Sequence, residues 1–226
     1  GAMTMFDLAP AMPEIVLALG AMALLMVGVF SKEEKAFETT NKLTMGLLVV
    51  TGVIMLTQLD GSRVLTFNNL FVTDGFAMFA KTLILIGSIA TLFMAGQYLA
   101  RENIARFEFS VLIALATVGM MLMVSANNLL SLYIGLELQS LSLYVLASIN
   151  RSNGRSTEAG LKYFVLGALS SGMLLYGMTL IYGFTGTTDF DVLASAVTEG
   201  SDNIGLIVGL VFLMAGLAFK VSAVPF

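Results

Sequence analysis

Four ionisable residues lie inside long apolar blocks of the sequence, namely Lys81, Glu137, Lys162 and Lys220. A charge near the centre of a bilayer costs at least about 2.5–3.5 kcal/mol on insertion scales, so such a residue is by default a functional candidate. A carboxylate and an amine can each take up or release a proton, and each stabilises the charged form of the other. These residue types therefore favour proton transfer as the chemistry.

Glu137 is the one carboxylate of this set. Ser140 and Tyr144 follow it at the i+3 and i+7 positions, which places all three side chains on one face of a helix. The polar stripe suits a carboxylate that exchanges a proton or that stabilises a neighbouring ammonium group. Position alone leaves open the alternative that Glu137 makes a structural hydrogen bond between helices.

Lys220 precedes Pro225 by five residues. Proline has no amide hydrogen to donate to the carbonyl group of Val221, so we predict a break or kink in the helix there. Irregular backbone at membrane depth is tolerated where it lines a cavity, and ionisable groups beside such breaks mark transport sites. The alternative is a lysine that extends its ammonium group to the membrane surface.

Lys162 and Lys81 are weaker candidates by position. Lys162 lies about one turn inside the apolar block 159–184, so a buried role and an extended, surface-reaching side chain remain equally open. Lys81 lies about two turns inside the block 75–98, and Asp74, seven residues earlier, is too far along the helix for a dependable contact. For Lys81 the position favours local pairing or extension to the interface.

The elements that must position these side chains are membrane-spanning helices. Of the 226 residues, 58% are hydrophobic and 12% are charged, whereas soluble domains average about 45–50% and about 25%. The apolar blocks fit a hydrocarbon core of roughly 30 Å. We therefore predict an all-α, polytopic transmembrane helical bundle with spans near 13–30, 43–58, 75–98, 109–125, 129–149, 159–184 and 204–226.

The segments outside the spans carry their own signals. Residues 1–12 form an N-terminal extension, in which Gly1-Ala2-Met3 is typical of the remnant of a cleaved purification tag. The alternating segment 64–73 turns at Asn68-Asn69 and predicts a short surface β-hairpin. Residues 189–197 predict an amphipathic interfacial helix. Asp74 is expected to cap the third span, and Ser156 or Thr157 the sixth.

The basic residues predict the orientation of the bundle. Seven of them follow the first, third and fifth spans, whereas the opposite side has only Arg63. Because positively charged loops are retained in the cytoplasm, we expect a periplasmic N-terminus. The seven are Lys32, Lys35, Lys42, Arg101, Arg106, Arg151 and Arg155.

The composition also argues against several classes of site. The chain has no Cys and no His, which are the usual ligands of iron–sulfur clusters, haem and structural zinc. It has neither a dinucleotide-binding GxGxxG motif after a strand nor a phosphate-binding GxxxxGK[ST] motif. We therefore expect no cofactor and no metal in this chain, and the net charge of −4 does not indicate a nucleic acid partner.

Several segments resemble a known family. The stretches NNLLSLYIGLELQSLSLYVLAS (127–148), EAGLKYFVLGALSSG (158–172) and GLAFKVSAVPF (216–226) are similar to the subunit N family of bacterial NADH:quinone oxidoreductase, respiratory complex I. The shorter DGFAMF (74–79) and PEI (13–15) agree with the same family. The resemblance thus covers essentially the whole chain. The related L and M subunits and the Mrp-type cation/proton antiporters share the fold.

The resemblance implies roles for three residues. Family members have a discontinuous seventh helix with a lysine, a glutamate in the fifth helix that pairs with it, and a second lysine at the start of the sixth. Lys220, Glu137 and Lys162 match these positions, whereas Lys81 matches no functional position of the family. The chain is then expected to hold the first repeat of an inverted-repeat, antiporter-like fold, because family members are roughly twice as long.

The resemblance also implies partners and a location. NADH, FMN, iron–sulfur clusters and quinone would be bound by other subunits of complex I, and the chain would contact membrane-arm subunits and the lipid bilayer of the bacterial inner membrane. Three functions remain open at this point: a proton-translocating subunit of complex I, a subunit of an Mrp-type antiporter, and a structural membrane scaffold. Hard cations prefer clusters of oxygen ligands, so one carboxylate among several amines favours protons.

Overall fold

The fold is known from a computed structural model that describes residues 8–31, 33–58, 63–102, 104–199 and 203–223. Within these ranges, six helices are long and apolar enough to cross a membrane. The predicted all-α membrane bundle is thereby confirmed. The six are α2 (Met12–Phe30), α3 (Glu33–Leu56), α4 (Gly75–Arg101), α5 (Phe107–Val124), α6 (Leu129–Ala147) and α7 (Gly154–Thr185).

The remaining elements are shorter. A 3-10 turn, η1 (Ala9–Ala11), precedes α2, and the strands β1 (Val64–Thr66) and β2 (Phe71–Thr73) lie between α3 and α4. The helices α8 (Phe190–Glu199) and α9 (Ile204–Lys220) follow α7. α9 is apolar but has only 17 residues, so the seventh predicted span is present as a shorter helix.

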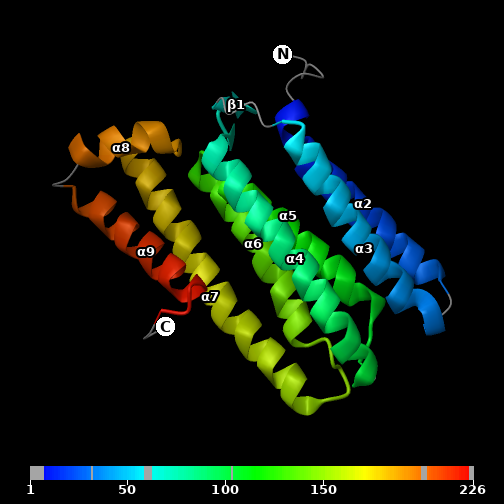
Figure 1. Ribbon diagram of the computed structural model, residues 1–226. Helices are drawn as coiled ribbons and strands as arrows, with labels where there is room; N and C mark the ends of the chain where they lie inside the picture. Colours follow the sequence, from blue (N-terminus) through cyan, green and yellow to red (C-terminus); the bar gives the residue numbers. More distant parts are fainter. Residues whose placement is uncertain (1–7, 32, 59–62, 103, 200–202, 224–226) are drawn as a thin grey trace.

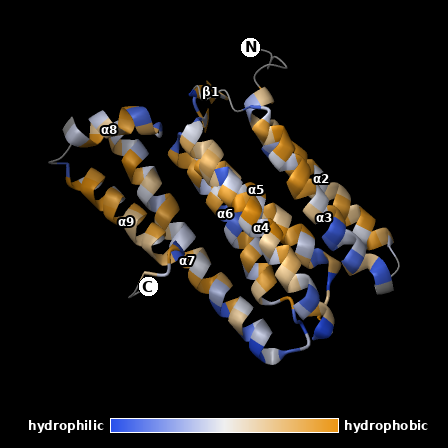
Figure 2. Cartoon of the chain, in the orientation of Figure 1, coloured by the Kyte–Doolittle hydropathy of each residue, from blue (hydrophilic) through white to orange (hydrophobic). Residues whose placement is uncertain are grey.

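Consecutive long helices run in opposite directions, side by side (Figure 1). α2 and α3 form one edge of the molecule, α4, α5 and α6 form the centre, and α7 with α9 forms the other edge. The hairpin and α8 lie at one end of the helices, and the α2–α3, α4–α5 and α6–α7 connections lie at the other. Apolar residues cover most of the helical surface between these ends (Figure 2).

Two apolar clusters hold the bundle together. The first joins α2, α3, α4 and α5. It includes four fully buried residues, Leu17, Leu48, Leu92 and Met121. The second joins α6, α7, α8 and α9 around Leu174 and Ile181. The packing of α5 against α6 connects the two clusters. α6, which carries Glu137, therefore lies at their boundary.

Two helices begin earlier than the hydropathy pattern predicts. α3 begins at Glu33 instead of residue 43, because a helix continues through charged residues that hydropathy assigns to a loop. Lys42 and Glu38 form an i,i+4 ion pair of 2.5 Å on this charged first part. α7 begins at Gly154, and its cap is Asn153, whose side-chain oxygen accepts from the amide of Arg155 at 3.0 Å. The expected caps Ser156 and Thr157 lie inside the helix.

The hairpin follows the predicted register. β1 and β2 are antiparallel, and Val64 pairs with Thr73. Asn68 and Asn69 have φ angles of 55° and 66°, as both central residues of a type I′ turn require. This matches the expected turn at Asn68-Asn69. Asp74 caps α4, as expected, and accepts from the amide of Ala77 at 2.7 Å.

The last turn of α9 ends directly after Lys220. Ser222 has a φ of 58°, and its amide donates to the carbonyl oxygen of Phe219 at 2.9 Å, while the amide of Ala223 donates to Ala218 at 2.8 Å. This pair of bonds is a Schellman motif with a left-handed residue after the cap. The helix thus stops at Lys220, whereas the predicted span continued to 226. Pro225, which was expected to cause the break, lies outside the described residues.

Candidate functional site

Lys220 lies in a pocket of hydroxyl groups between three helices. Its ammonium nitrogen Nζ donates to Ser140 Oγ and Tyr144 Oη of α6, both at 3.0 Å, and to Ser171 Oγ of α7 at 3.1 Å. An ammonium group has three N–H donors. The three hydroxyl groups therefore satisfy the whole hydrogen-bonding capacity of Lys220.

Glu137 lies beside this pocket. Its carboxylate oxygen Oε1 is 3.6 Å from Lys220 Nζ, and the two side chains are 21% and 10% exposed. The hydroxyl group of Ser171 also donates to Glu137 Oε1. Ser171 thus accepts from the ammonium group and donates to the carboxylate, so one hydroxyl group bridges the two charges.

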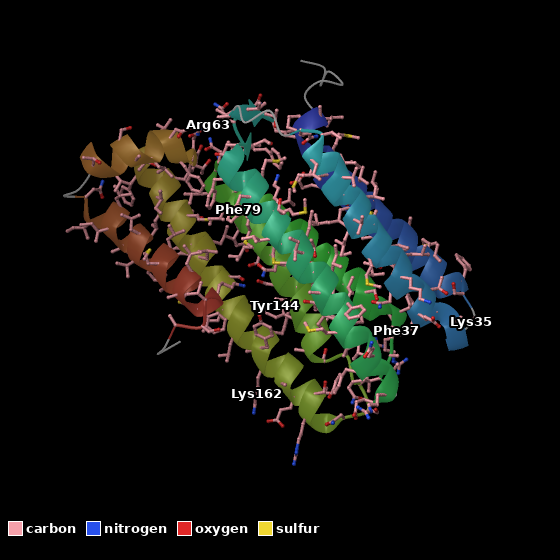
Figure 3. All side chains as sticks on the ribbon, in the orientation of Figure 1. Lys35, Phe37, Arg63, Phe79, Tyr144 and Lys162 are labelled. Atoms are coloured by element: carbon pink, nitrogen blue, oxygen red, sulfur yellow. The ribbon has the colours of Figure 1, made fainter. Side chains whose placement is uncertain are left out.

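The surrounding helices fix the position of Tyr144. Its ring packs edge-on against Tyr163, at a centroid distance of 4.6 Å, and against Phe164 at 5.7 Å. A Cβ atom at Gly167 would lie 2.0 Å from the Tyr144 hydroxyl oxygen, so the missing side chain makes room for the phenol. Tyr144 lies in the last turn of α6, which ends at Ala147, and Figure 3 shows it farther than Lys162 from the end of α7 at which the α6–α7 connection lies.

A close approach of α7 and α9 brings Lys220 to the site. A Cβ atom at Gly177 of α7 would lie 2.7 Å from the backbone oxygen of Gly209 in α9. Farther along, Ser170 donates to the carbonyl oxygen of Gly216 at 3.0 Å. Small residues at the crossing thus allow backbone contact between the two helices.

The structure brings together four of the residues predicted from the sequence: Glu137, Ser140, Tyr144 and Lys220. Ser171 was not predicted, although it contacts both charged groups. The available signal was the polar pair Ser170-Ser171 in the middle of an apolar span. Sequence alone does not show which face of α7 meets α6 and α9, so the pair was not singled out.

Lys162 lies outside this cluster. It forms an i,i+4 ion pair with Glu158 on α7, and the two side chains are 70% and 61% exposed. It sits closer than Tyr144 to the end of α7 at which the α6–α7 connection lies (Figure 3). The described chain therefore shows Lys162 separate from the Glu137–Lys220 pair.

Lys81 is completely buried and does not extend to the membrane surface. Its ammonium nitrogen lies 2.5 Å from Glu14 Oε1 of α2, and the two side chains are 1% and 3% exposed. The sequence argument considered Asp74 as a partner and missed Glu14. The overlooked signal was a carboxylate in the first turn of an apolar span, two residues after the helix begins.

The Glu137–Lys220 cluster can hold, move or release a proton. The short path from ammonium to carboxylate passes through one hydroxyl group, and the opposite charges stabilise each other in a medium of low dielectric constant. Within the described ranges, His, Cys, Asp and Glu side chains form no group of three that would suit a metal ion. The geometry thus defines a membrane helical protein with a partly buried glutamate–lysine pair that hydroxyl groups connect.

Comparison with known proteins agrees with this class. Residues 126–226 match the family described as "NADH:quinone oxidoreductase/Mrp antiporter, TM". NADH-quinone oxidoreductase subunit N of Rhodospirillum rubrum is 56% identical over 97% of the chain, and that of Paramagnetospirillum magneticum is 53% identical over 97%. The chain covers 45% and 46% of these relatives, so it spans about half the length of the curated relatives it matches.

A solved structure shows the same fold. A chain of respiratory complex I from Thermus thermophilus, determined with bound aureothin, superposes with a TM-score of 0.76 at 29% identity. The match covers 95% of this chain and 45% of that one. The chain therefore has the antiporter-like fold, and it is a homologue of the N-terminal half of subunit N of NADH-quinone oxidoreductase.

Proposed function

We propose that the chain is part of a proton-translocating, antiporter-like membrane subunit of NADH:quinone oxidoreductase. The observation that supports this most directly is the partly buried contact of Lys220 with Glu137 and with three hydroxyl groups from α6 and α7. The three hydroxyl groups accept hydrogen bonds from the ammonium group and so stabilise a charged lysine inside the membrane. The 3.6 Å separation leaves the carboxylate free to move relative to it.

The proposed mechanism is electrostatic. A carboxylate close to a lysine favours the protonated amine, and its withdrawal favours release of the proton. A displacement of α6 relative to α9 would change the distance between the two charges. Proton binding is then a property of the Glu137–Lys220 pair, because binding of a proton to one group changes the affinity of the other group for a proton.

The energy for this cycle would come from other subunits. NADH oxidation and quinone reduction, with their FMN and iron–sulfur clusters, are assigned to partner subunits, and their charge changes would reach this chain through the neighbouring membrane-arm subunits. The chain itself contains no Cys or His. We place it in the bacterial inner membrane with the N-terminus on the periplasmic side.

Lys162 and Pro225 have separate proposed roles. Lys162 would exchange protons with water at the cytoplasmic end of α7, where its side chain is exposed beside Glu158. Pro225 would prevent the helix from resuming after the Schellman motif that ends α9 at Lys220. Lys162→Met in the complete subunit tests the first role: slower proton pumping with unchanged thermal stability supports it, and unchanged pumping contradicts it.

Two other functions make different predictions. An Mrp-type cation/proton antiporter would bind Na⁺ or K⁺, but the cluster offers one carboxylate beside an ammonium group, which repels cations. A structural scaffold would assign no activity to the buried charges. The curated relatives named subunit N, at 53% and 56% identity, favour the complex I assignment over both.

Glu137→Gln in the complete respiratory complex tests the proposal. The amide preserves the shape and can still accept from Ser171, but it carries no charge and takes up no proton. We expect proton pumping and coupled quinone reduction to fall about tenfold or more, measured in reconstituted vesicles with NADH. Glu38→Gln, on the exposed first part of α3, is the matched control. Unchanged rate and proton-to-electron ratio in Glu137→Gln would support the scaffold.

A further inference from the structure

A second buried glutamate–lysine pair lies at the other side of the bundle. Lys81 of α4 and Glu14 of α2 are in contact at 2.5 Å. Apart from this ion pair, neither carboxylate oxygen of Glu14 has a hydrogen-bond donor among the described residues. The ammonium group of Lys81 is thus the compensating partner of this carboxylate, in contrast to the hydroxyl-rich surroundings of Lys220.

The surroundings of this pair are apolar. A cavity of about 390 Å³ beside Glu14 is lined by side chains of η1, α2, the hairpin, α5 and α6, and Glu14 is the ionisable residue among them. Asp74, the nearest acid on α4, is engaged in capping that helix. Because both side chains are buried, separation of the two charges would leave each of them uncompensated.

Lys81 also contacts the β-hairpin. Its ammonium nitrogen lies 4.8 Å from the centroid of the Phe71 ring in β2, which is within the range of a cation–π interaction. Phe71 is 6% exposed. The contacts of this pair therefore connect α2, α4 and β2.

The hairpin in turn determines where α6 begins. The amide of Val72 donates to the carbonyl oxygen of Ser125 at 2.8 Å, and the amide of Asn127 donates to that of Leu70 at 3.2 Å. Phe71 itself forms a β-bridge with Ala126. Asn128 follows directly and caps α6. A continuous series of contacts thus leads from Lys81 to the helix that carries Glu137.

We propose that Glu14 and Lys81 are positioning residues, which fix the hairpin and thereby set the location of α6 relative to Lys220. This rests on the proposed function of the Glu137–Lys220 pair. Glu137, Ser140 and Tyr144 all belong to α6, so a displaced α6 changes every α6 contact of Lys220 at once. Misplacement on the order of 1 Å can reduce a rate by ~100-fold.

The test separates positioning from stability in the complete respiratory complex. Lys81→Met leaves the Glu14 carboxylate buried without compensation, so both thermal stability and proton pumping should fall. In the double variant Glu14→Leu/Lys81→Met, an apolar pair replaces the ions, and stability should recover, as found for other buried ion pairs. Pumping should stay about tenfold below the unmodified complex, because the contact to Phe71 is still missing.

Two further variants complete the experiment. Lys81→Arg keeps the charge and the contact with the ring, so it should restore pumping to at least about half of the unmodified rate. Ser88→Ala, on the same helix, removes a buried bond to Thr117 without contacting the hairpin, and it should leave pumping unchanged. Thermal stability is measured as loss of the subunit from the heated, purified complex.

Each outcome bears on the proposal. If the double variant recovers pumping together with stability, the pair is structural and the positioning role is wrong. Failure of Lys81→Arg to restore pumping, in a subunit of normal stability, also contradicts it. Glu137→Gln is measured in parallel. Unchanged pumping in Glu137→Gln would refute the proposed function of the Glu137–Lys220 pair, independently of the stability results for Glu14 and Lys81.

Discussion

The partly buried Glu137–Lys220 pair and the fully buried Glu14–Lys81 pair differ in how their charges are solvated. Lys220 donates to three hydroxyl groups and lies 3.6 Å from Glu137, whereas Lys81 lies 2.5 Å from Glu14 beside an aromatic ring. In the first pair, hydroxyl groups share the stabilisation of the ammonium, so the carboxylate can move without leaving a bare charge. In the second pair, separation leaves both charges uncompensated. The surroundings of Glu137 and Lys220 therefore suit the proposed exchange of protons, whereas those of Glu14 and Lys81 suit a pair that fixes the positions of helices.

At the scale of single residues, Ser171→Ala tests the bridging hydroxyl group. The variant removes a hydrogen bond to each of two charged groups, and such bonds contribute about 1.5–3 kcal/mol. We expect coupled proton pumping in the complete complex to fall roughly tenfold. Stopped-flow or fluorescence measurements of proton uptake in vesicles provide the check.

Ser170→Ala is the matched control for Ser171→Ala. Ser170 is the neighbouring residue on α7, but it donates to the backbone oxygen of Gly216 and touches neither charge. Its loss should reduce stability by about 1 kcal/mol and leave the proton-to-electron ratio unchanged. If both variants lose pumping equally, the bridging role of Ser171 is wrong.

The sequence predicted part of this site. The helical period placed Glu137, Ser140 and Tyr144 on one face, and the pairing of Glu137 with Lys220 was implied by family resemblance. Ser171 and Glu14 were missed, because a partner on another helix depends on how the helices are packed and rotated. Local periodicity reports the face of one helix and carries no information about its neighbour's face.

At the scale of helices, the crossing of α7 and α9 depends on glycine. A Cβ atom at Gly177 would lie 2.6 Å from the amide nitrogen of Leu213. Because that atom belongs to the backbone, the helix must shift as a unit to avoid the overlap. The shift would move Lys220, at the end of α9, away from the hydroxyl groups of α6.

Gly177→Val should therefore impair both stability and pumping. Overpacking of this kind costs typically about 1–3 kcal/mol, and the displaced lysine should lower the pumping rate further. Gly172→Ala, on the same helix, is the control, because a Cβ atom there meets nothing within 4 Å. Thermal unfolding and proton pumping are measured for both variants. A Gly177→Val protein with unchanged stability would show that α7 and α9 do not approach this closely.

The end of α9 offers a separate test. Ser222 adopts a φ of 58° in the Schellman motif, a conformation that costs a residue with a Cβ atom about 1–2 kcal/mol and that glycine adopts readily. Ser222→Gly should stabilise the subunit by up to about 1 kcal/mol, whereas Ser222→Val should destabilise it. Thermal unfolding of the two variants should move in opposite directions. A shift in the same direction would contradict the left-handed conformation.

The sequence located these elements more reliably than it located their ends. Apolar blocks mark the part of a helix that lies in hydrocarbon, but hydrogen bonding within the helix continues past it, as in α3 from Glu33 and α7 from Gly154. The hairpin was predicted in register, since the alternating segments place Asn68-Asn69 at the turn and asparagine tolerates a positive φ. The Schellman end at Ser222 was not predicted, because serine gives no comparable signal.

At the scale of the whole molecule, charge is distributed unevenly between the two ends. Arg63 lies at the hairpin end, whereas Lys35 lies at the opposite end (Figure 3). Arg63 is paired with Asp191 of α8 at 3.0 Å, so the basic residue at the hairpin end is also neutralised. The remaining described arginines lie in the α4–α5 and α6–α7 connections or in the helix turns beside them, namely Arg101, Arg106, Arg151 and Arg155. This asymmetry is the basis for the proposed orientation.

Cysteine labelling can test that orientation directly, because the chain contains no native cysteine. Ser152→Cys lies in the α6–α7 connection and Ser195→Cys on α8, and both positions are exposed. A membrane-impermeant maleimide should label Ser195→Cys in vesicles whose periplasmic face is outward, and Ser152→Cys in inverted vesicles, since basic loops are retained in the cytoplasm. The reverse pattern would place the N-terminus in the cytoplasm. It would also place Lys162, near the Ser152 end, on the periplasmic side, and its proposed exchange of protons with water at the cytoplasmic end would then be wrong.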